Sequence, residues 1–416
     1  MSDPFIPFHR PSIGQAEREA VLAVLDSGWL TTGPRTVLFE ESFASFVGAA
    51  HAVAVNSATA ALHLALEAIG VRAGDDVVVP TYTFASSGEV ALYLGARPVL
   101  VDVDPVTLGA DPDAIERAIT PRTRAVQVVH VAGLPAELAA IERAIEHGAR
   151  REGLASPPPI VEDVAHAFPS RVAALEGRFA GTVGRAGAFS FYATKTITTG
   201  EGGMLVTDDA DLAGRARQMR LHGISRDAWR RYSATGSWYY EIEAAGFKDN
   251  PTDLAAALGL AQLARADELR ESRADIAARY LARLADAAAA GRVVLPASGT
   301  GREHSWHLFV IRVGPASRLD GSVDTSLPGV AGLPHRLRPM ASRRARAIVA
   351  LAGDGVGTSV HFIPLHLHPL YRGMGSRPGD HPNAEAAYAG AISLPIWPGM
   401  SDAEVERVVA AVSAIF

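Results

Sequence analysis

The sequence predicts an α/β fold, in which a large domain with a mostly parallel sheet flanked by helices precedes a smaller α+β domain. Two observations predict it. Short apolar runs alternate with segments of helical apolar spacing through the first half, and the composition changes after about residue 250. At 416 residues the chain has the length for two domains, which we expect at residues 1–250 and 251–416.

The first half contains the strands of the expected large sheet. Each strand is a short apolar run, which is typical of a strand buried on both faces. Residues 59–69 and 86–94 follow the first two runs and carry apolar residues at helical spacing. The expected strands are residues 52–55, 76–80, 98–103, 125–130, 160–162 and 204–207.

The second half begins at Thr252 and Asp253, residue types that start helices, and a stretch rich in alanine, leucine and charged residues follows. We expect this stretch to be a long helix that links the two domains. Glycine, proline and serine then gather in an irregular surface excursion. The expected elements are a helix at 254–284, strands at 306–313 and 357–362, the irregular segment at 314–340 and a closing helix at 405–416.

The composition excludes several classes of protein. A hydrophobic content of 48% with 20% charged residues is typical of a soluble globular chain. The net charge of −6 and the pI near 6.2 argue against nucleic-acid binding. We interpret Arg343, Arg344 and Arg346 as a solvated helix face. The absence of cysteine excludes disulfides, thiolate metal sites and a cysteine nucleophile.

Nothing in the sequence indicates a membrane protein. No apolar run reaches the roughly 18 residues that a membrane helix needs, and Arg97 interrupts the best candidate. The start of the chain, Met1 to Pro4, lacks the basic and apolar segments of a signal peptide. We therefore expect a cytoplasmic protein with neither membrane nor nucleic-acid partners.

An aspartate at a strand end and a lysine in a polar loop form the most informative pair. Asp163 follows an apolar run, and Lys195 lies 32 positions later among serine, threonine and glycine residues. Pyridoxal phosphate (PLP) chemistry needs both groups, because a lysine amine forms the Schiff base and a carboxylate keeps the pyridine nitrogen protonated. Glu162 points to the opposite face of a continuous strand, so Asp163 is preferred. The alternative interpretations are a strand-end cap and a surface lysine.

A second group of residues is suited to bind phosphate. Residues 56–61 lie where a strand ends and a helix begins, so free backbone amides and the helix dipole favour a dianion there. Ser57 and Thr59 can add hydroxyl groups, although both also favour a plain N-cap. Ser190, five residues before Lys195, is a further hydroxyl and favours the phosphate interpretation.

Aromatic and histidine side chains complete the expected cofactor site. After the strand at 76–80, either Phe84 or Tyr82 can cover the face of the cofactor ring, and either can instead belong to the core. His166, three residues after Asp163, can approach the phenolic oxygen of the cofactor or serve a structural role.

Taken together, these motifs resemble those of the PLP-dependent nucleotide-sugar aminotransferases of the DegT/StrS type. The resemblance covers nearly the whole length, and its specificity comes from the combination of segments. The matching segments are residues 27–34, 56–66, 80–86, 161–167, 190–203 and 361–366.

This resemblance implies an aspartate-aminotransferase-like fold (fold type I) and a homodimer with shared active sites. It implies transfer of an amino group from L-glutamate to a keto carbon of a nucleoside-diphosphate sugar, with pyridoxamine phosphate and 2-oxoglutarate formed on the way. Lys195 is then the Schiff-base lysine and catalytic base, Asp163 the partner of the pyridine nitrogen and Phe84 the stacking residue. The implied phosphate cradle consists of Ser57, Ala58, Thr59 and Ser190.

One segment departs from the family pattern. In the family, a residue near 246–250 reaches the phosphate held by the other subunit, and here either Lys248 or Asn250 is the candidate. Asp249 stands where an aromatic residue is usual, and Pro251 where an apolar residue such as methionine is usual. The irregular segment at 314–340 also matches the family poorly.

Two other functions are weighed against the aminotransferase. A pyridoxamine-phosphate-dependent sugar dehydratase on the same scaffold has histidine in place of the lysine, so Lys195 argues against it. A catalytically silent binding or regulatory homologue is disfavoured by the intact pair of Asp163 and Lys195.

A histidine cluster near the C-terminal end is interpreted as part of the substrate site. His361, His366 and His368 lack a neighbouring carboxylate cluster, so we expect no metal. We place Thr31, His361 and His366 near the substrate instead. Residues 361–368 resemble C4 aminotransferases of UDP-linked 4-keto-6-deoxy sugars more than C3 enzymes, so amination at C4 is expected. The sugar, the nucleotide and any assembly beyond a dimer are left open.

Overall fold

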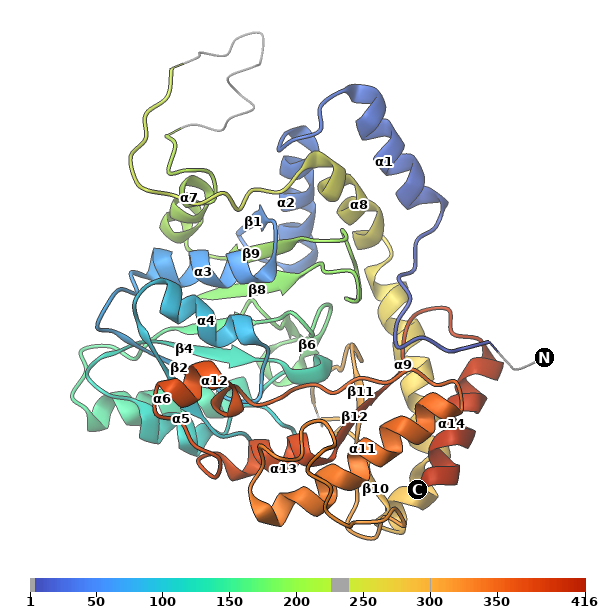
Figure 1. The fold of residues 1–416 in the computed structure, drawn as a ribbon. Helices are drawn as coiled ribbons and strands as arrows, with labels where there is room; N and C mark the ends of the chain where they lie inside the picture. Colours follow the sequence, from blue (N-terminus) through green and yellow to red (C-terminus); the bar gives the residue numbers. More distant parts are fainter. Residues whose placement is uncertain (1–3, 226–238, 300) are drawn as a thin grey trace.

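Seven strands form a central sheet in the first half of the chain (Figure 1). The computed structural model describes residues 4–225, 239–299 and 301–416. Neighbouring strands are parallel except that β9 runs antiparallel to both β1 and β8, so the prediction of a mostly parallel sheet is confirmed. In sheet order the strands are β1 (His51–Val55), β9 (Gly203–Thr207), β8 (Ala186–Ser190), β5 (Ile160–Asp163), β4 (Thr123–Val129), β2 (Asp76–Pro80) and β3 (Arg97–Val101).

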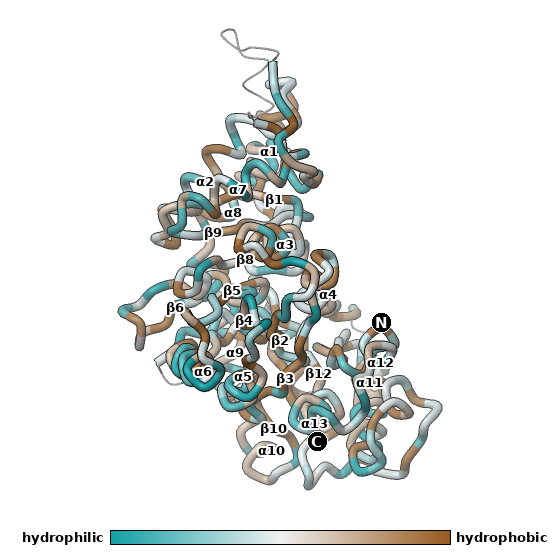
Figure 2. Tube along the Cα trace, turned by 90° about the vertical axis from the view of Figure 1, so that its left-hand side faces the viewer, coloured by the Kyte–Doolittle hydropathy of each residue, from teal (hydrophilic) through white to brown (hydrophobic). Residues whose placement is uncertain are grey.

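Alternating side chains of these strands feed two separate apolar layers, because successive residues of a strand point to opposite faces. In β2, Val77 and Val79 pack with α3, α4 and α7, whereas Val78 packs with α5 and α6. Figure 2 shows the apolar strands inside and the hydrophilic outer side of α6. Helices thus cover both faces of the sheet. They are α3 (Ala58–Ile69), α4 (Ala85–Tyr93), α7 (Ala210–Met219), α5 (Pro112–Ala118) and α6 (Leu138–Arg151).

A smaller antiparallel sheet lies in the C-terminal part of the chain. Phe309 and Ile311 of β11 pack against α9, α11 and α14, while Val310 faces α13. The predicted closing helix corresponds to α14. The elements are β10 (Val293–Val294), β11 (Phe309–Val313), β12 (Ala391–Leu394), α9 (Ala266–Arg283), α10 (Ala285–Ala289), α11 (Arg338–Gly353), α12 (Pro369–Gly373), α13 (Pro382–Gly390) and α14 (Asp402–Ile415).

Two further groups of elements complete the described fold. Phe39 and Phe43 of α2 pack under β1 and β9, on the face opposite α3, together with α8. A short hairpin lies between β5 and β8 in the sequence. These elements are α1 (Gln15–Ser27), α2 (Pro34–Val47), α8 (Asp253–Leu263), β6 (Arg171–Val172) and β7 (Arg178–Phe179).

Two predicted elements of the second half are wrong in detail. The single helix expected at 254–284 is divided into α8 and α9, which meet at Ala264 and Arg265. The strand expected at 357–362 does not form: the chain there makes only one bridge, between Ser359 and Ser393 of β12. Beyond Ser359 the chain turns toward the large sheet, where the Tyr82 hydroxyl donates to the carbonyl oxygen of His361.

The arginines expected to form a solvated helix face instead fasten the irregular segment to α11. Arg343 Nε donates to the Leu319 carbonyl at 3.0 Å, and Arg346 Nη2 donates to Ser322 Oγ at 3.0 Å. Arg344 is only 3% exposed and reaches the Pro328 carbonyl at 3.1 Å. Because guanidinium groups carry several donors, each can hold a loop carbonyl or hydroxyl while its stem packs on the helix.

Within the three described ranges, every helix is too short or too polar to span a membrane. Residues 1–3, on which the signal-peptide prediction bears, lie outside those ranges. The division into domains at residues 250 and 251 stays a prediction.

Candidate active site

A cavity of about 690 Å³ opens where the parallel strands of the large sheet end. Val129 ends β4, Asp163 ends β5 and Ser190 ends β8, and all three line the cavity. The carboxyl edge of an open α/β sheet is where such folds bind ligands, because several loops converge there. The volume suits a ligand of cofactor size.

Lys195 reaches into this cavity from the loop after β8. Its Nζ lies 3.3 Å from Nε2 of His307. Burial, opposed by Asp163 and reinforced by Arg273, lowers the pKa of Lys195 to about 8. A lysine amine with this pKa is neutral in a substantial fraction of molecules near pH 7–8, so it can act as a nucleophile and as a base.

Asp163 is fully enclosed at the end of β5. Ser87 Oγ donates to its Oδ2 at 2.8 Å, and the amide of Ala165 donates to Oδ1 at 3.1 Å. Burial raises the pKa of Asp163 against these hydrogen bonds. No cation pairs with Asp163 among the residues that the structure describes. A buried carboxylate that lacks a cation fits the protonated pyridine nitrogen of PLP.

Glu162, the neighbour of Asp163, points to the other side of the sheet as predicted. It accepts hydrogen bonds from His130 Nε2 at 2.9 Å and from the amides of Gly181 and Val183 at 2.8 Å. These contacts, with burial opposing them, lower the pKa of Glu162. Glu162 therefore anchors the loop before β8 and has no place in the cavity.

The residues of the predicted phosphate cradle lie together on the wall of the cavity. Ser57, Ala58 and Thr59 form the start of α3, and Ser190 faces them from β8. A Cβ on Gly203 would collide with the backbone of Ser57, so only glycine lets β9 approach the helix start this closely. Ser57 Oγ also caps α3 by accepting from the Ala60 amide at 3.1 Å. The N-cap and the phosphate interpretations are therefore compatible.

Phe84 and Tyr82, the two candidates for covering the cofactor ring, occupy different environments. Tyr82 is fully buried, whereas Phe84 is 62% exposed and lines the cavity. Phe362 lies 6.1 Å from Phe84 and stacks on His166, with ring centroids 5.5 Å apart. Of the two candidates, Phe84 is therefore the one available to a bound ring.

His166 and His307 form a pair beside Lys195. Their ring centroids are 4.6 Å apart. The Ala132 amide donates to Nδ1 of His166 at 3.3 Å, so the proton of this neutral ring is on Nε2, where it can be donated. Burial and the nearby Lys195 keep the pKa of both histidines well below the usual value. His307 is not among the residues predicted from the sequence, because a lone histidine in an apolar run gives no signal of its own.

The remaining candidates lie at the rim or outside the cavity. His361 lines it, and its Nδ1 is 2.8 Å from Ser393 Oγ. His366 does not: it is fully buried, and its ring nitrogens contact Thr81 Oγ1 at 2.8 Å and Glu385 Oε1 at 3.0 Å. With both nitrogens engaged, His366 has none to offer a substrate, contrary to the prediction.

Thr31, Lys248 and Asn250 also lie outside the lining of the cavity. Lys248 Nζ donates to Asn250 Oδ1, and Asn250 Nδ2 donates to Thr32 Oγ1 at 2.7 Å. The Lys248 carbonyl accepts from Asn56 Nδ2 at 3.3 Å, which places this segment next to the residues that lead into Ser57. The side chains of Lys248, Asn250 and Thr32 thus form a cluster of their own.

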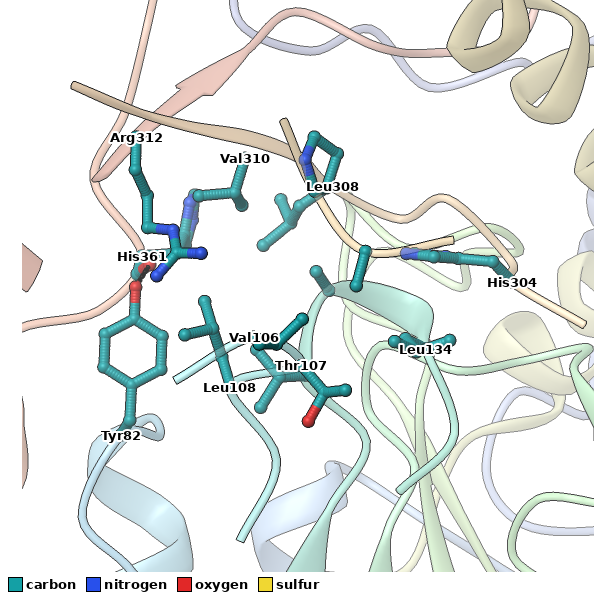
Figure 3. Close-up of a pocket in the computed structure, with 14 residues that line it drawn as sticks. Tyr82, Val106, Thr107, Leu108, Leu134, His304, Leu308, Val310, Arg312 and His361 are labelled. Carbon is teal, nitrogen blue, oxygen red and sulfur yellow. Dashed lines mark hydrogen bonds between the residues drawn. The ribbon is translucent and has the colours of Figure 1, made fainter. Parts of the chain in front are cut away.

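A second, smaller cavity lies behind His361 (Figure 3). Its volume of about 30 Å³ has room for a single water molecule. Figure 3 shows Tyr82 pointing toward His361 with the Arg312 guanidinium beside it, and Leu134 and His304 on the opposite side. This cavity is a gap between β11 and the loops of the large sheet, and it is too small for a cofactor. Among the described residues, no cluster of histidine and acidic side chains is arranged to hold a metal ion.

Comparison with known proteins gives one consistent result. The sequence model of the DegT/DnrJ/EryC1/StrS aminotransferase family matches residues 11–327 and 329–413. The chain is 44% identical over 413 residues to the spore coat polysaccharide biosynthesis protein SpsC of Bacillus subtilis, covering 99% of this chain and 97% of that protein.

Solved structures agree with the sequence match. The sugar aminotransferase Spr1654 from Streptococcus pneumoniae in its pyridoxamine phosphate form has a TM-score of 0.86 and 32% identity, over 99% of this chain and 98% of that one. The same relative has been solved in apo and PLP forms. PseC from Helicobacter pylori, an aminotransferase of pseudoaminic acid biosynthesis, has a TM-score of 0.84 and 25% identity, over 100% and 99% of the two chains.

Proposed function

The chain belongs to the DegT/DnrJ/EryC1/StrS aminotransferase family, and from this we propose that it moves an amino group from L-glutamate to a keto carbon of a nucleoside-diphosphate keto-deoxysugar. The family and its solved members are PLP-dependent sugar aminotransferases. The single observation that carries the proposal is the cavity in which Lys195 and Asp163 meet at the carboxyl edge of the sheet.

PLP is the cofactor, and its proposed contacts follow from the geometry. Asp163 would hold the pyridine nitrogen, the start of α3 together with Ser190 would hold the phosphate, and Phe84 would cover the ring. When bound, the cofactor supplies an electron sink for negative charge on the carbon next to the amino nitrogen. His166, with its proton on Nε2, is placed to donate to the phenolic oxygen.

Lys195 moves the protons in this proposal. Its neutral Nζ takes a proton from the α carbon of the amino donor, and in the second half of the cycle it delivers a proton to the former keto carbon of the sugar. His307 Nε2, 3.3 Å away, orients that amine. Asp163 opposes the loss of charge, so the amine can also hold the proton between the two transfers.

We place the active enzyme in a homodimer, with Lys248 and Asn250 reaching the phosphate bound by the other subunit. Both side chains lie outside the cavity of their own subunit, beside the segment that leads into Ser57. The composition supports a specific role for Lys248. The sequence has two lysines, Lys195 and Lys248, and 37 arginines among its 39 Lys and Arg residues. Nearly all cationic side chains of the chain are therefore arginines, and position 248 is one of the two exceptions.

The amination position is proposed to be C4, with C3 as the alternative. The support is the resemblance of residues 361–368 to C4 enzymes, together with the lining of the cavity by His361. Lys195 argues against a sugar dehydratase, because dehydratases on this scaffold have histidine in place of the lysine. A cytoplasmic location stays a prediction.

The test is a panel of UDP-, dTDP- and GDP-linked 4-keto and 3-keto sugars, each supplied with glutamate. Product mass identifies the amino sugar, and release of 2-oxoglutarate counts turnovers. We expect turnover with at least one 4-keto substrate and a loss of more than about 10³-fold in Lys195→Ala. Amino transfer by Lys195→Ala at the wild-type rate, or dehydration in place of amination by the wild type, would contradict the proposal.

A further inference from the structure

One fully buried arginine close to the active site has no counter-ion among the residues that the structure describes. Arg273 lies on α9 and is 0% exposed. Its Nη1 donates to the carbonyls of Ile396 at 2.9 Å, His307 at 3.3 Å and Trp306 at 3.5 Å, while Nε and Nη2 have no partner. No carboxylate forms an ion pair with it in the described part of the chain. Burial lowers the pKa of Arg273 to about 9, so it remains protonated at neutral pH.

Leaving a buried charge unpaired is costly, and folds generally avoid it unless the charge has a use. The contacts of Arg273 suggest that use. They hold the backbone on either side of the His307 side chain, and Trp306 there has a φ of 51°, a conformation that large residues rarely adopt. The His307 side chain, just before β11, contacts the Lys195 amine, and among the described residues no other side chain next to β11 does so. Arg273 therefore helps to fix the backbone that carries this contact.

We propose that Arg273 is a positioning residue for the amine of Lys195. Through the carbonyl of His307 it keeps the histidine ring against Nζ, and its unneutralised charge opposes a second positive charge on that amine. The proposal deepens the function above, because it rests on Lys195 being the reactive amine.

The charges around Lys195 come from several elements. The histidines that face it are neutral at pH 7, since burial lowers the pKa of His9 and His361 to about 4 and those of His166 and His307 well below the usual value. The opposite charges of Asp163 and Arg273 then determine whether the Lys195 amine is protonated. The groups that face Lys195 are Asp163 at the end of β5, His166 after β5, His9 in the N-terminal arm, His307 before β11, His361 after α11 and Arg273 on α9.

The test is to measure the protonation of Lys195 directly. Full-length protein freed of cofactor is labelled with trace acetic anhydride between pH 6 and 11, and peptide mass spectrometry follows each lysine. Only two lysines exist, and the exposed Lys248 serves as the internal reference. Arg273→Met should move the labelling midpoint of Lys195 to higher pH by on the order of one unit, the size expected for loss of a nearby, poorly solvated charge.

Arg344→Met is the matched control. Arg344 is also a buried arginine, and it also donates to backbone carbonyls, those of Tyr388 and Pro328. It faces α13 and the irregular segment instead of Lys195. Its removal should lower the melting temperature but leave the Lys195 midpoint where it is. An equal shift in Arg344→Met would overturn the proposal, because the effect would then be general loosening.

Arg273→Gln covers the case in which the methionine variant does not fold. The amide can still donate to the His307 carbonyl, but it has no charge, so the midpoint should rise as with methionine. A folded Arg273→Gln protein with the wild-type midpoint would refute the electrostatic role. The measurement needs neither cofactor nor turnover. Its failure can therefore be told apart from failure of the proposed function, which is tested by the sugar panel and by turnover of Lys195→Ala.

Discussion

Lys195 and Asp163 face one cavity, and their surroundings displace the two pKa values in opposite directions. Burial lowers the pKa of the lysine to about 8 and raises the pKa of the carboxyl. Both displacements favour the neutral form of the group. A cationic ring nitrogen next to Asp163 would favour the charged carboxylate, so binding of the cofactor and ionisation of Asp163 are expected to be coupled.

Asp163→Asn tests the role of this carboxylate. The variant keeps the size and one hydrogen-bond acceptor but lacks the negative charge that keeps the pyridine nitrogen protonated, so kcat should fall by about 10²–10³-fold. Ser87→Ala removes the hydroxyl that donates to Asp163 and leaves the charge, so its loss should be below about tenfold. Both are read from 2-oxoglutarate release at saturating glutamate. A near-wild-type rate in Asp163→Asn would remove the assigned role.

For single residues, the sequence allowed those predictions that rest on strand alternation and on the order of motifs. Strand periodicity separates Glu162 from Asp163, and the structure places the two on opposite sides of the sheet. Side-chain environments could not be predicted. The burial of Tyr82 and the engagement of both nitrogens of His366 depend on segments far apart in the sequence. His307 was missed for the same reason.

Among the elements, the strands of the large sheet were the most predictable. Apolar runs bounded by turn residues correspond to β1, β2, β4 and β9 within one or two residues. β8 was not expected, because its sequence (Ala186–Ser190) is small and lacks β-branched residues. The break between α8 and α9 was also missed, since neither glycine nor proline marks it.

One side chain joins two helices, α8 and α2, and its contribution can be tested. Asp253, at the first position of α8, accepts hydrogen bonds at the start of α2 from the amides of Gly33 at 2.8 Å and Thr36 at 3.0 Å, and from Thr36 Oγ1 at 2.7 Å. It is 2% exposed. Asp253→Ala should therefore lower the free energy of unfolding by about 2–3 kcal/mol.

Thr252→Ala is the comparison for this prediction. Thr252 caps α8 alone, through the Ala255 amide at 3.1 Å, so its removal should cost only about 1 kcal/mol. Urea unfolding of both variants measures the difference. If Asp253→Ala is no less stable than Thr252→Ala, the carboxylate does not organise α2.

For the whole molecule, burial of neutral histidines predicts how stability depends on pH. In the folded protein their pKa values are lowered, so below about pH 6.5 the unfolded chain takes up protons that the folded one does not. Stability must then fall as the pH drops from about 6.5 toward 4. Burial lowers the pKa to about 4 in His9, His361 and His381 and to about 3 in His304, and it keeps the pKa values of His166 and His307 well below the usual value.

Urea unfolding at half-unit steps from pH 7.5 to 4.5 measures this dependence. Uptake of two or more protons corresponds to a slope of at least about 3 kcal/mol per pH unit near pH 5. Asp163, Glu142 and Asp249, whose pKa values burial raises, work in the opposite direction but are fewer than the histidines. A flat profile between pH 6.5 and 5 would show that these histidines are not held neutral.

The fold class was predictable as a whole, because alternating strands and helices allow few arrangements. The homodimer and the division into domains stay predictions. Hydrophobic periodicity in the sequence indicates strands and helices, but it does not indicate the surface of a dimer or the boundary between two domains. The segment at 314–340 was expected to match the family poorly, but the family model covers it except for residue 328. Arg343 and Arg344 fasten this segment to α11.

The most direct test of the account is to reduce the protein with borohydride in the presence of PLP and to locate the label by peptide mass. Because the sequence has only two lysines, the label has few possible positions. We predict a stable pyridoxyl group on Lys195 and none on Lys248, with a yellow protein before reduction. Label on Lys248 alone, or no label with full cofactor present, would contradict the central claim that Lys195 is the cofactor-binding amine.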